Sequence, residues 1–276
     1  MRAAGHAPRR SLRYVSVTMR SAMLALVLKL TLAPALVATA TQVAGRLGHR
    51  AGGLVGGLPV VAGPILLIYA IEQGEAFAAE AARGAVLGIV SLVGFCLAYA
   101  LAALRRGTAV ALAAGWTAFG AGTVAFSALT PPLALGTAVT LAAVAGGTAA
   151  LYRLIPESDP GKRGPDLLTW RLAVTAVLVL ALTGVAGSLS PHLAGLLAPF
   201  PIITAVLAGF TQFHTGPGAA VELLAGLSGA LVCFTAFFAT LAALIGPLGA
   251  ATAFALATGA ALAGWGMLVA VVARSR

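Results

Sequence analysis

Charged residues are scarce in this sequence. They make up 9% of its 276 positions, and only 7 residues are aspartate or glutamate. A water-soluble domain carries about 25% charged residues, so this chain lacks the polar surface that such a domain needs. With 60% hydrophobic residues and a mean hydropathy of +1.02, the chain is expected to reside in a lipid bilayer.

Cysteines and catalytic motifs are also scarce. Cys96 and Cys233 are the 2 cysteines, and both lie in apolar segments outside any CxxC or Cys/His cluster, which argues against a disulfide or a metal site. The sequence contains no nucleophile motif, phosphate-binding loop or dinucleotide fingerprint. We therefore expect neither an enzyme nor a bound cofactor.

Basic residues outnumber acidic ones and give a net charge of +10. In a soluble protein this charge would suggest a nucleic-acid partner. Here the Lys and Arg residues lie in short connections between apolar segments, where they indicate the cytoplasmic side of a membrane. We therefore predict an integral protein of the cytoplasmic (inner) membrane, surrounded by membrane lipids and without a nucleic-acid partner.

Apolar segments bounded by Gly, Pro and charged residues predict about nine transmembrane helices, and thus an all-α, polytopic membrane helix bundle. The predicted spans are 22–45, 53–72, 77–104, 108–129, 132–153, 169–188, 193–213, 219–245 and 248–272. The first span also has features of a signal peptide. It is assigned as a helix because no clear cleavage site followed by a hydrophilic domain is present.

The second half of the chain repeats the first. At an offset of 142, residues 28–104 align with residues 170–246 without a gap. Three matched pairs carry most weight: Pro59 with Pro201, Gly74 with Gly216, and Glu80 with Glu222. Because such pairs are rarer coincidences than paired Ala or Leu in this composition, the match predicts an internal duplication.

The duplication divides the chain into four parts. They are a basic N-terminal tail (1–20), a first repeat of four helices (21–130), a connector helix with a linker (131–166), and a second repeat of four helices (167–276). Since the repeats begin five helices apart, the second enters the membrane from the opposite side if every segment spans it, so the repeats are predicted to be inverted. The fourth helix has no clean match but is the candidate partner of the ninth.

The loop charges predict an orientation. Basic residues cluster around four connections or ends: Arg46 and Arg50, Arg105 and Arg106, Arg153 to Arg171, and Arg274 and Arg276. These positions, and the C-terminus with them, are expected in the cytoplasm. With nine spans, the N-terminus is then predicted on the outside. The arginine-rich N-terminal tail conflicts with this prediction, and only a start near Met19 or a different helix count would remove the conflict.

Residues 28–74 contain a short pattern of basic residues followed by a Gly-Leu-Pro sequence. Lys29 lies in the first helix, Arg46 in the loop after it, and Gly57-Leu58-Pro59 at the start of the second helix. In these features the segment resembles the opening of GlpM-type small inner-membrane proteins and their uncharacterised four-helix relatives. In the second repeat, Arg171 and Pro199-Phe200-Pro201 are similar, but Ser188 replaces the loop arginine. The resemblance implies a small membrane protein that was duplicated and fused, and it implies no particular activity.

Prolines interrupt the starts of the predicted second and seventh helices. They are Pro59 and Pro64 in the first repeat, and Pro199 and Pro201 in the second. A proline frees a backbone carbonyl, which inside a membrane must be satisfied by protein or by a water-lined cavity. The four prolines are therefore candidate helix breaks near a binding site, although simple packing kinks would explain them as well.

Glu80 and Glu222 are the carboxylates that the two repeats share. As a symmetric pair within the membrane, they would bind cations or exchange protons. Alternatively, each only favours the helix dipole from the first turn of its helix, an effect of about 0.3 to 1 kcal/mol. Under the first interpretation, we expect both to approach one shared polar region between the repeats.

Four further residues are candidate substrate- or proton-binding groups: Glu72, His214, Lys29 and Arg171. Glu72 and His214 are equivalent in the alignment, and a histidine beside membrane carboxylates can shuttle protons. Lys29 and Arg171 are also equivalent and would neutralise an anionic substrate. An interfacial position for the histidine, and snorkelling of the two cations to the headgroups, are simpler alternatives.

Together these features favour a secondary transporter or flippase for an unidentified small or lipid-linked solute. Inverted repeats can expose one central site alternately to the two sides of a membrane. The alternative is a non-transporting membrane scaffold or accessory subunit, in which the same residues only cap helices.

Overall fold

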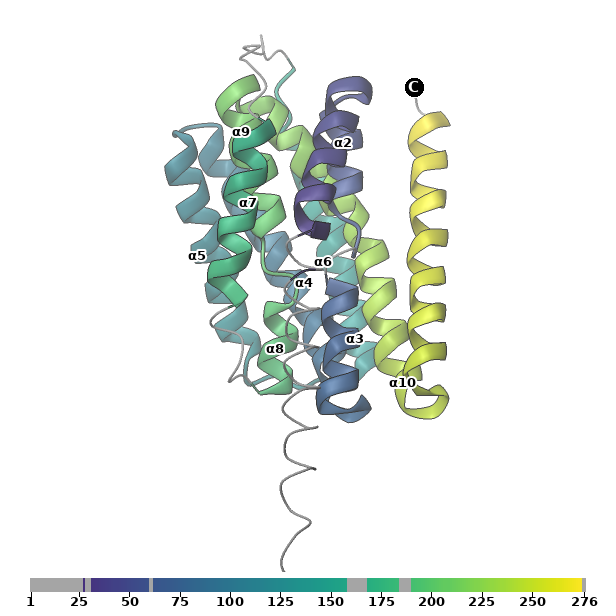
Figure 1. Cartoon of the computed structure of the whole chain (residues 1–276). Helices are drawn as coiled ribbons and strands as arrows, with labels where there is room; N and C mark the ends of the chain where they lie inside the picture. The colour runs from purple at the N-terminus through teal and green to yellow at the C-terminus, as the bar shows by residue number, and fades with distance from the viewer. Residues whose placement is uncertain (1–26, 28–30, 60–61, 158–167, 184–189, 275–276) are drawn as a thin grey trace, which may run out of the picture.

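A computed structural model of the chain describes residues 27, 31–59, 62–157, 168–183 and 190–274, and these residues form helices without any strand (Figure 1). After a helix over residues 31–47, the elements are α2 (His49–Gly56), α3 (Ala62–Gln73), α4 (Glu75–Ala103), α5 (Thr108–Phe126), α6 (Leu133–Leu154), α7 (Leu168–Thr183), α8 (Pro191–Leu197), α9 (Ile202–Thr215) and α10 (Pro217–Arg274).

Long apolar helices dominate the described part of the chain. Five stretches are long and apolar enough to cross a membrane: Glu75–Ala103, Thr108–Phe126, Leu133–Leu154, Pro191–Thr215 and Pro217–Ala270. Large apolar side chains on these helices also face outward, as Val124 and Met267 do with 73% and 72% exposure. Such a surface suits lipid tails as solvent. The chain is thus a membrane-type helix bundle, as predicted.

Two of the predicted spans are each broken into a short and a longer helix. In the first repeat α2 and α3 are separated by residues 57–61, and in the second repeat α8 and α9 are separated by residues 198–201. These breaks are equivalent at the offset of 142. In each predicted repeat, a short helix of seven or eight residues therefore precedes the longer helix.

The candidate helix-breaking prolines differ in their positions. Pro59 lies in the first break, and Pro199 and Pro201 lie in the second. Pro64 does not break a helix, because it lies in the first turn of α3, where the missing N–H would have no helical partner.

α10 is a run of 58 residues that is folded back on itself at Gly249, whose φ of 75° and ψ of 164° are non-helical. This φ suits a residue without a Cβ. The two arms, residues 217–246 and 250–274, correspond to the predicted eighth and ninth helices (Figure 1). Gly249 is equivalent at offset 142 to Gly107, which precedes α5. The pairing of the fourth helix with the ninth stays a prediction, and the shared position of these two glycines agrees with it.

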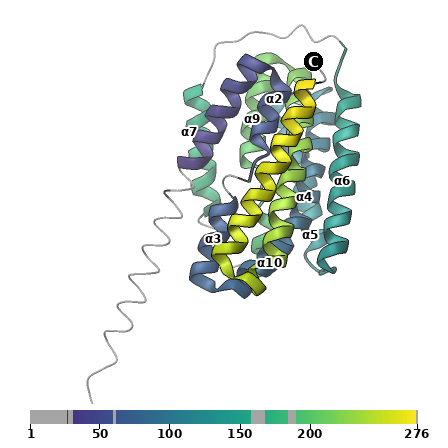
Figure 2. The ribbon, with the colours of Figure 1, turned by 90° about the vertical axis from the view of Figure 1, so that its right-hand side faces the viewer.

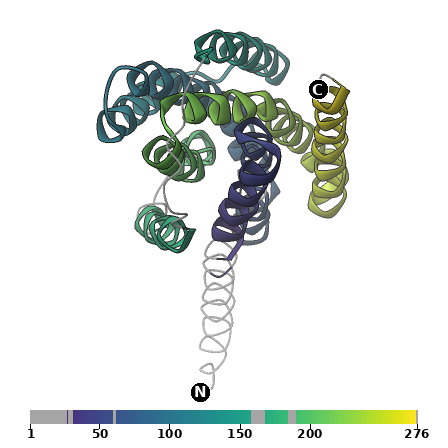
Figure 3. The same ribbon diagram turned by 90° about the horizontal axis from the view of Figure 1, so that it is seen from above.

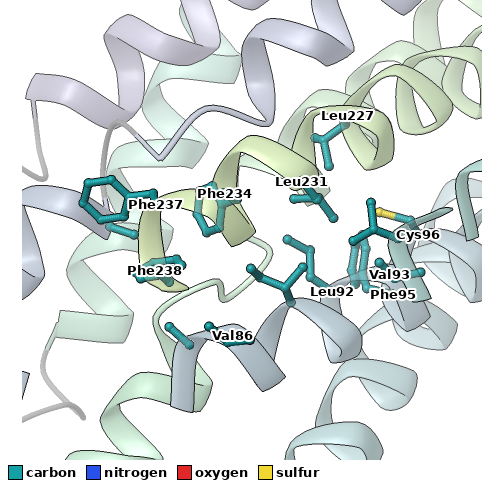
Figure 4. Packing of buried hydrophobic residues seen from close by; sticks show 14 of the residues in the cluster. Val86, Leu92, Val93, Phe95, Cys96, Leu227, Leu231, Phe234, Phe237 and Phe238 are labelled. Atoms are coloured by element: carbon teal, nitrogen blue, oxygen red, sulfur yellow. The ribbon is translucent and has the colours of Figure 1, made fainter. Parts of the chain in front are cut away.

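The core lies between α4 and the first arm of α10, which are equivalent helices of the two repeats. Figure 4 shows Leu92, Phe95 and Cys96 of α4 near Leu227 and Leu231 of α10, and all five are buried. Seen from above, the first arm of α10, in light green, crosses the middle of the bundle (Figure 3). The remaining helices surround this central pair.

Each short helix packs against the long helix of the other repeat. A Cβ added to Gly195 of α8 would clash with the carbonyl oxygen of Ala81 in α4, and one added to Gly53 of α2 would clash with that of Leu223 in α10. At offset 142, Gly53 is equivalent to Gly195, and Ala81 is equivalent to Leu223. The two predicted repeats therefore meet through a reciprocal pair of backbone contacts.

The connector helix α6 contacts equivalent positions of both repeats. The hydroxyl of Thr140 donates to the Val86 carbonyl at 2.9 Å, and the hydroxyl of Thr148 donates to the Ser228 hydroxyl at 3.0 Å. Val86 and Ser228 are equivalent at offset 142. Val144 lies midway between the two threonines and is buried.

Candidate functional site

The structure separates Glu80 from Glu222. Glu80 lies on α4 beside α8, and Glu222 lies on α10 beside α2. In Figure 1, α2 is at the upper end of the bundle and α8 at the lower end. The expectation of one shared polar region is therefore wrong, because each glutamate packs near the short helix of the other repeat, and the two short helices lie at opposite ends.

The lower cluster is built around His192, in the first turn of α8. The Glu80 carboxylate lies 3.6 Å from His192 Nδ1, and His192 Nε2 lies 3.3 Å from the Phe126 carbonyl oxygen. With Arg83 these side chains line a cavity of 60 Å³. Solute pockets are typically about 300 Å³ or larger, so this cavity is suited to water and protons.

The upper cluster surrounds Arg171 in the first turn of α7, and its side chain is buried. Its Nη1 donates to the Thr41 hydroxyl at 3.1 Å, and its guanidinium lies 5.6 Å from the centre of the Phe210 ring. Glu222 and Arg171 are both close enough to His49 to act on it electrostatically. Arg171 is thus packed within the protein instead of snorkelling to the headgroups.

The remaining candidates are distributed between the two ends. Buried His214 stacks on Phe210, with ring centres 6.1 Å apart, and so lies near the upper cluster. Glu72 is half-buried near the end of α3, beside Tyr69. The structure does not bring these two equivalent residues together, because α3 and α9 end on opposite sides of the bundle (Figure 1). Lys29 lies outside the described residues.

Two polar residues outside the list of candidates make contacts between distant segments. One is His192, the partner of Glu80. Its signal was its equivalence to Arg50 at offset 142, which places a basic residue in the first turn of each short helix. The other is Glu75, whose carboxylate accepts a hydrogen bond of 2.7 Å from the Ala250 backbone N–H and so caps the second arm of α10.

Two apolar grooves lie beside the broken helices. The first, which we call the α9 groove, lies between α5, α7 and α9 and has a volume of 340 Å³. The second, the α3 groove, lies between α3 and the second arm of α10, in yellow in Figure 2, and has a volume of 530 Å³. Both volumes are in the range of ligand pockets, about 300 to 1,000 Å³.

The two grooves are equivalent. Five lining positions of one match five of the other at offset 142: Gly63 with Ala205, Pro64 with Val206, Leu67 with Gly209, Phe254 with Leu112, and Thr258 with Trp116. The walls are almost entirely apolar, so a hydrocarbon chain fits them better than an ion or a sugar does. Sequence reasoning missed the grooves because their walls consist of ordinary apolar residues.

No known protein family, characterised protein or solved structure matches this chain. The likeness to GlpM-type proteins therefore stays a prediction. Within the described ranges, no group of three or more His, Cys, Asp and Glu residues is placed to hold a metal ion.

Proposed function

We propose that this chain is a transporter or flippase of the cytoplasmic (inner) membrane, built from inverted repeats that span the membrane nine times, and that its solute is lipid-linked. The observation that carries the proposal is the pair of equivalent apolar grooves, each beside a broken helix. A lipid-linked solute would place its hydrocarbon chain in a groove and its polar part among charged residues near that groove.

The course of the helices supports inversion. In Figure 1, α3 descends whereas its equivalent α9 ascends, as the colour gradient shows. The connector gives independent support, since a two-fold axis that exchanges Val86 with Ser228 also exchanges Thr140 with Thr148. Such an axis reverses α6 and so runs perpendicular to it. If α6 spans the membrane, the axis lies in the membrane plane.

The reciprocal contacts support alternating access. Each short helix rests on the long helix of the other repeat, so a movement of one repeat is transmitted to the other. Discontinuous helices at a repeat interface are typical of transporter binding sites. The grooves differ in volume, 340 against 530 Å³, as expected if the repeats adopt different conformations within one state.

The orientation can be tested by labelling single cysteines in a background without Cys96 and Cys233. Arg46→Cys, Arg105→Cys and Arg153→Cys should react only with reagents that reach the cytoplasm, because basic loops are retained there. Thr130→Cys, in an exposed connection that lacks Lys and Arg, should react from outside and serves as the control. Labelling of two arginine positions from outside would overturn the nine-span arrangement.

Transport can be tested in liposomes with a fluorescent lipid, by following its accessibility to a membrane-impermeant quencher. We expect the wild-type protein to move the lipid between leaflets and the Glu80→Gln/Glu222→Gln variant to do so at least tenfold more slowly, since both polar clusters lose their carboxylate. Glu157→Gln, at an exposed position, is the matched control. Equal rates in all three proteins, at equal membrane levels, would favour the scaffold.

A further inference from the structure

We infer that the α9 groove binds an anionic phospholipid, with an acyl chain between α5, α7 and α9 and the phosphate at Arg105 and Arg106. This inference names the substrate class and to that extent rests on the proposed function. Binding is nevertheless a separate property, which can be measured in the absence of transport.

The shape of the groove fits a hydrocarbon chain. Thr108, Leu112 and Trp116 line it from α5 at intervals of four residues, which places them on one face of the helix over about 12 Å. Gly209 leaves the opposite wall open, since a Cβ there would make only ordinary contacts, the nearest at 3.6 Å with Thr108. The groove thus follows α5 for about 12 Å between apolar walls.

Positive charge gathers at one mouth of the groove. Arg105 and Arg106 are exposed and lie directly before Gly107 and α5. The end of α9 reaches the same place, because the Gln212 amide donates to the Arg106 carbonyl at 3.2 Å. Behind the groove wall, the Arg171 guanidinium faces the Phe210 ring. A phosphate is the lipid group that these cations would bind, since Arg pairs with phosphate through several N–H donors.

The equivalent α3 groove lacks this charge. At offset 142, Pro247 and Leu248 replace Arg105 and Arg106, and the Glu75 carboxylate binds the backbone at Ala250. Two grooves of common origin and similar lining therefore differ in the charge of their mouths. A hydrocarbon chain would suit both, whereas a negative headgroup suits the α9 groove alone.

The test uses Trp116, which lines the groove and is 37% exposed, as the sole tryptophan after Trp170→Phe and Trp265→Phe. In lipid nanodiscs, phosphatidylglycerol with brominated acyl chains should quench Trp116 at a mole fraction at least threefold lower than brominated phosphatidylcholine does. Arg105→Gln/Arg106→Gln should abolish this preference, while Arg153→Gln, an exposed cation on α6, should keep it. Equal quenching by both lipids in the unmodified groove would overturn the proposal.

A second variant tests the groove itself. Gly209→Leu would fill it and should reduce the quenching by phosphatidylglycerol at least twofold, whereas Gly146→Leu, with no neighbour within 4 Å of its Cβ position, should not. Unchanged quenching in Gly209→Leu would count against the site. Selective quenching without lipid movement in liposomes would refute the transport function and leave the lipid site intact, and lipid movement without selective quenching would do the reverse.

Discussion

Gly195→Ala is expected to destabilise the protein by about 3 kcal/mol, at the upper end of the range for overpacking. The added Cβ meets the carbonyl oxygen of Ala81, and a backbone carbonyl within α4 cannot rotate away as a flexible side chain would. Gly53→Ala creates the equivalent clash with Leu223. We expect losses of similar size at the two sites, measured as a fall in the melting temperature in detergent.

Gly94→Ala is the matched control. Gly94 lies within α4, the helix against which Gly195 packs. No atom lies within 4 Å of the position that a Cβ of residue 94 would take. Alanine is favoured over glycine in a helix by roughly 0.5 to 1 kcal/mol, so this variant should be as stable as the wild type or slightly more so. If Gly195→Ala and Gly94→Ala melted at the same temperature, the close crossing of α8 over α4 would be wrong.

Gln212→Leu is the other substitution with a large expected effect. The Tyr99 hydroxyl donates to Gln212 Oε1 at 2.6 Å. Gln212 Nε2 donates to the carbonyl of Ala103, the last residue of α4, and to that of Arg106 just beyond it. Both side chains are buried. Loss of the amide leaves a buried hydroxyl and helix-terminal carbonyls without these partners, at a cost of about 3 kcal/mol in the free energy of unfolding.

A double-mutant cycle separates the Tyr99 bond from the remainder of this loss. In the Gln212→Leu background, Tyr99→Phe should cost nothing or recover part of the stability, because it removes the unpaired hydroxyl. In the wild-type background the same change should destabilise by about 1 kcal/mol. Thermal unfolding of the four proteins tests this, and strict additivity would contradict the hydrogen bond. The apolar equivalents Ala70 and Leu241 already replace this pair in the other repeat.

Much of the fold is predictable because bilayer physics leaves few alternatives. Apolar length predicts helices, and the described ends of α4, α5 and α6 lie within a few residues of the predicted ones. The paired prolines predict the two breaks, since a residue without an N–H is poorly tolerated within a helix. The counterpart of α5 is harder to recognise, because the equivalence of Gly107 and Gly249 stands among residues that have diverged.

The site is less predictable, because it depends on contacts between distant segments. Glu80 and Glu222 share a sequence position, and symmetry suggests that they converge. They do not converge, because each glutamate lies beside the short helix of the other predicted repeat, as Glu80 lies beside His192 of α8. No local pattern specifies which helix α8 crosses. The grooves likewise arise from the arrangement of α5, α7 and α9, and not from any residue type that marks a site.

The threonine contacts of α6 have a consequence for how substitutions act. A helix that crosses a pseudo-symmetry axis presents the same environment to residues at equal distances on either side of its midpoint, so its sequence tends to read alike in both directions. Outward from Val144, Thr140 matches Thr148 at four residues on either side. Under the proposed inversion, a point substitution within one repeat leaves the equivalent position of the other repeat unchanged. Val144 would instead lie on the axis between the repeats, so a substitution there would act on both and have no equivalent site to compensate for it.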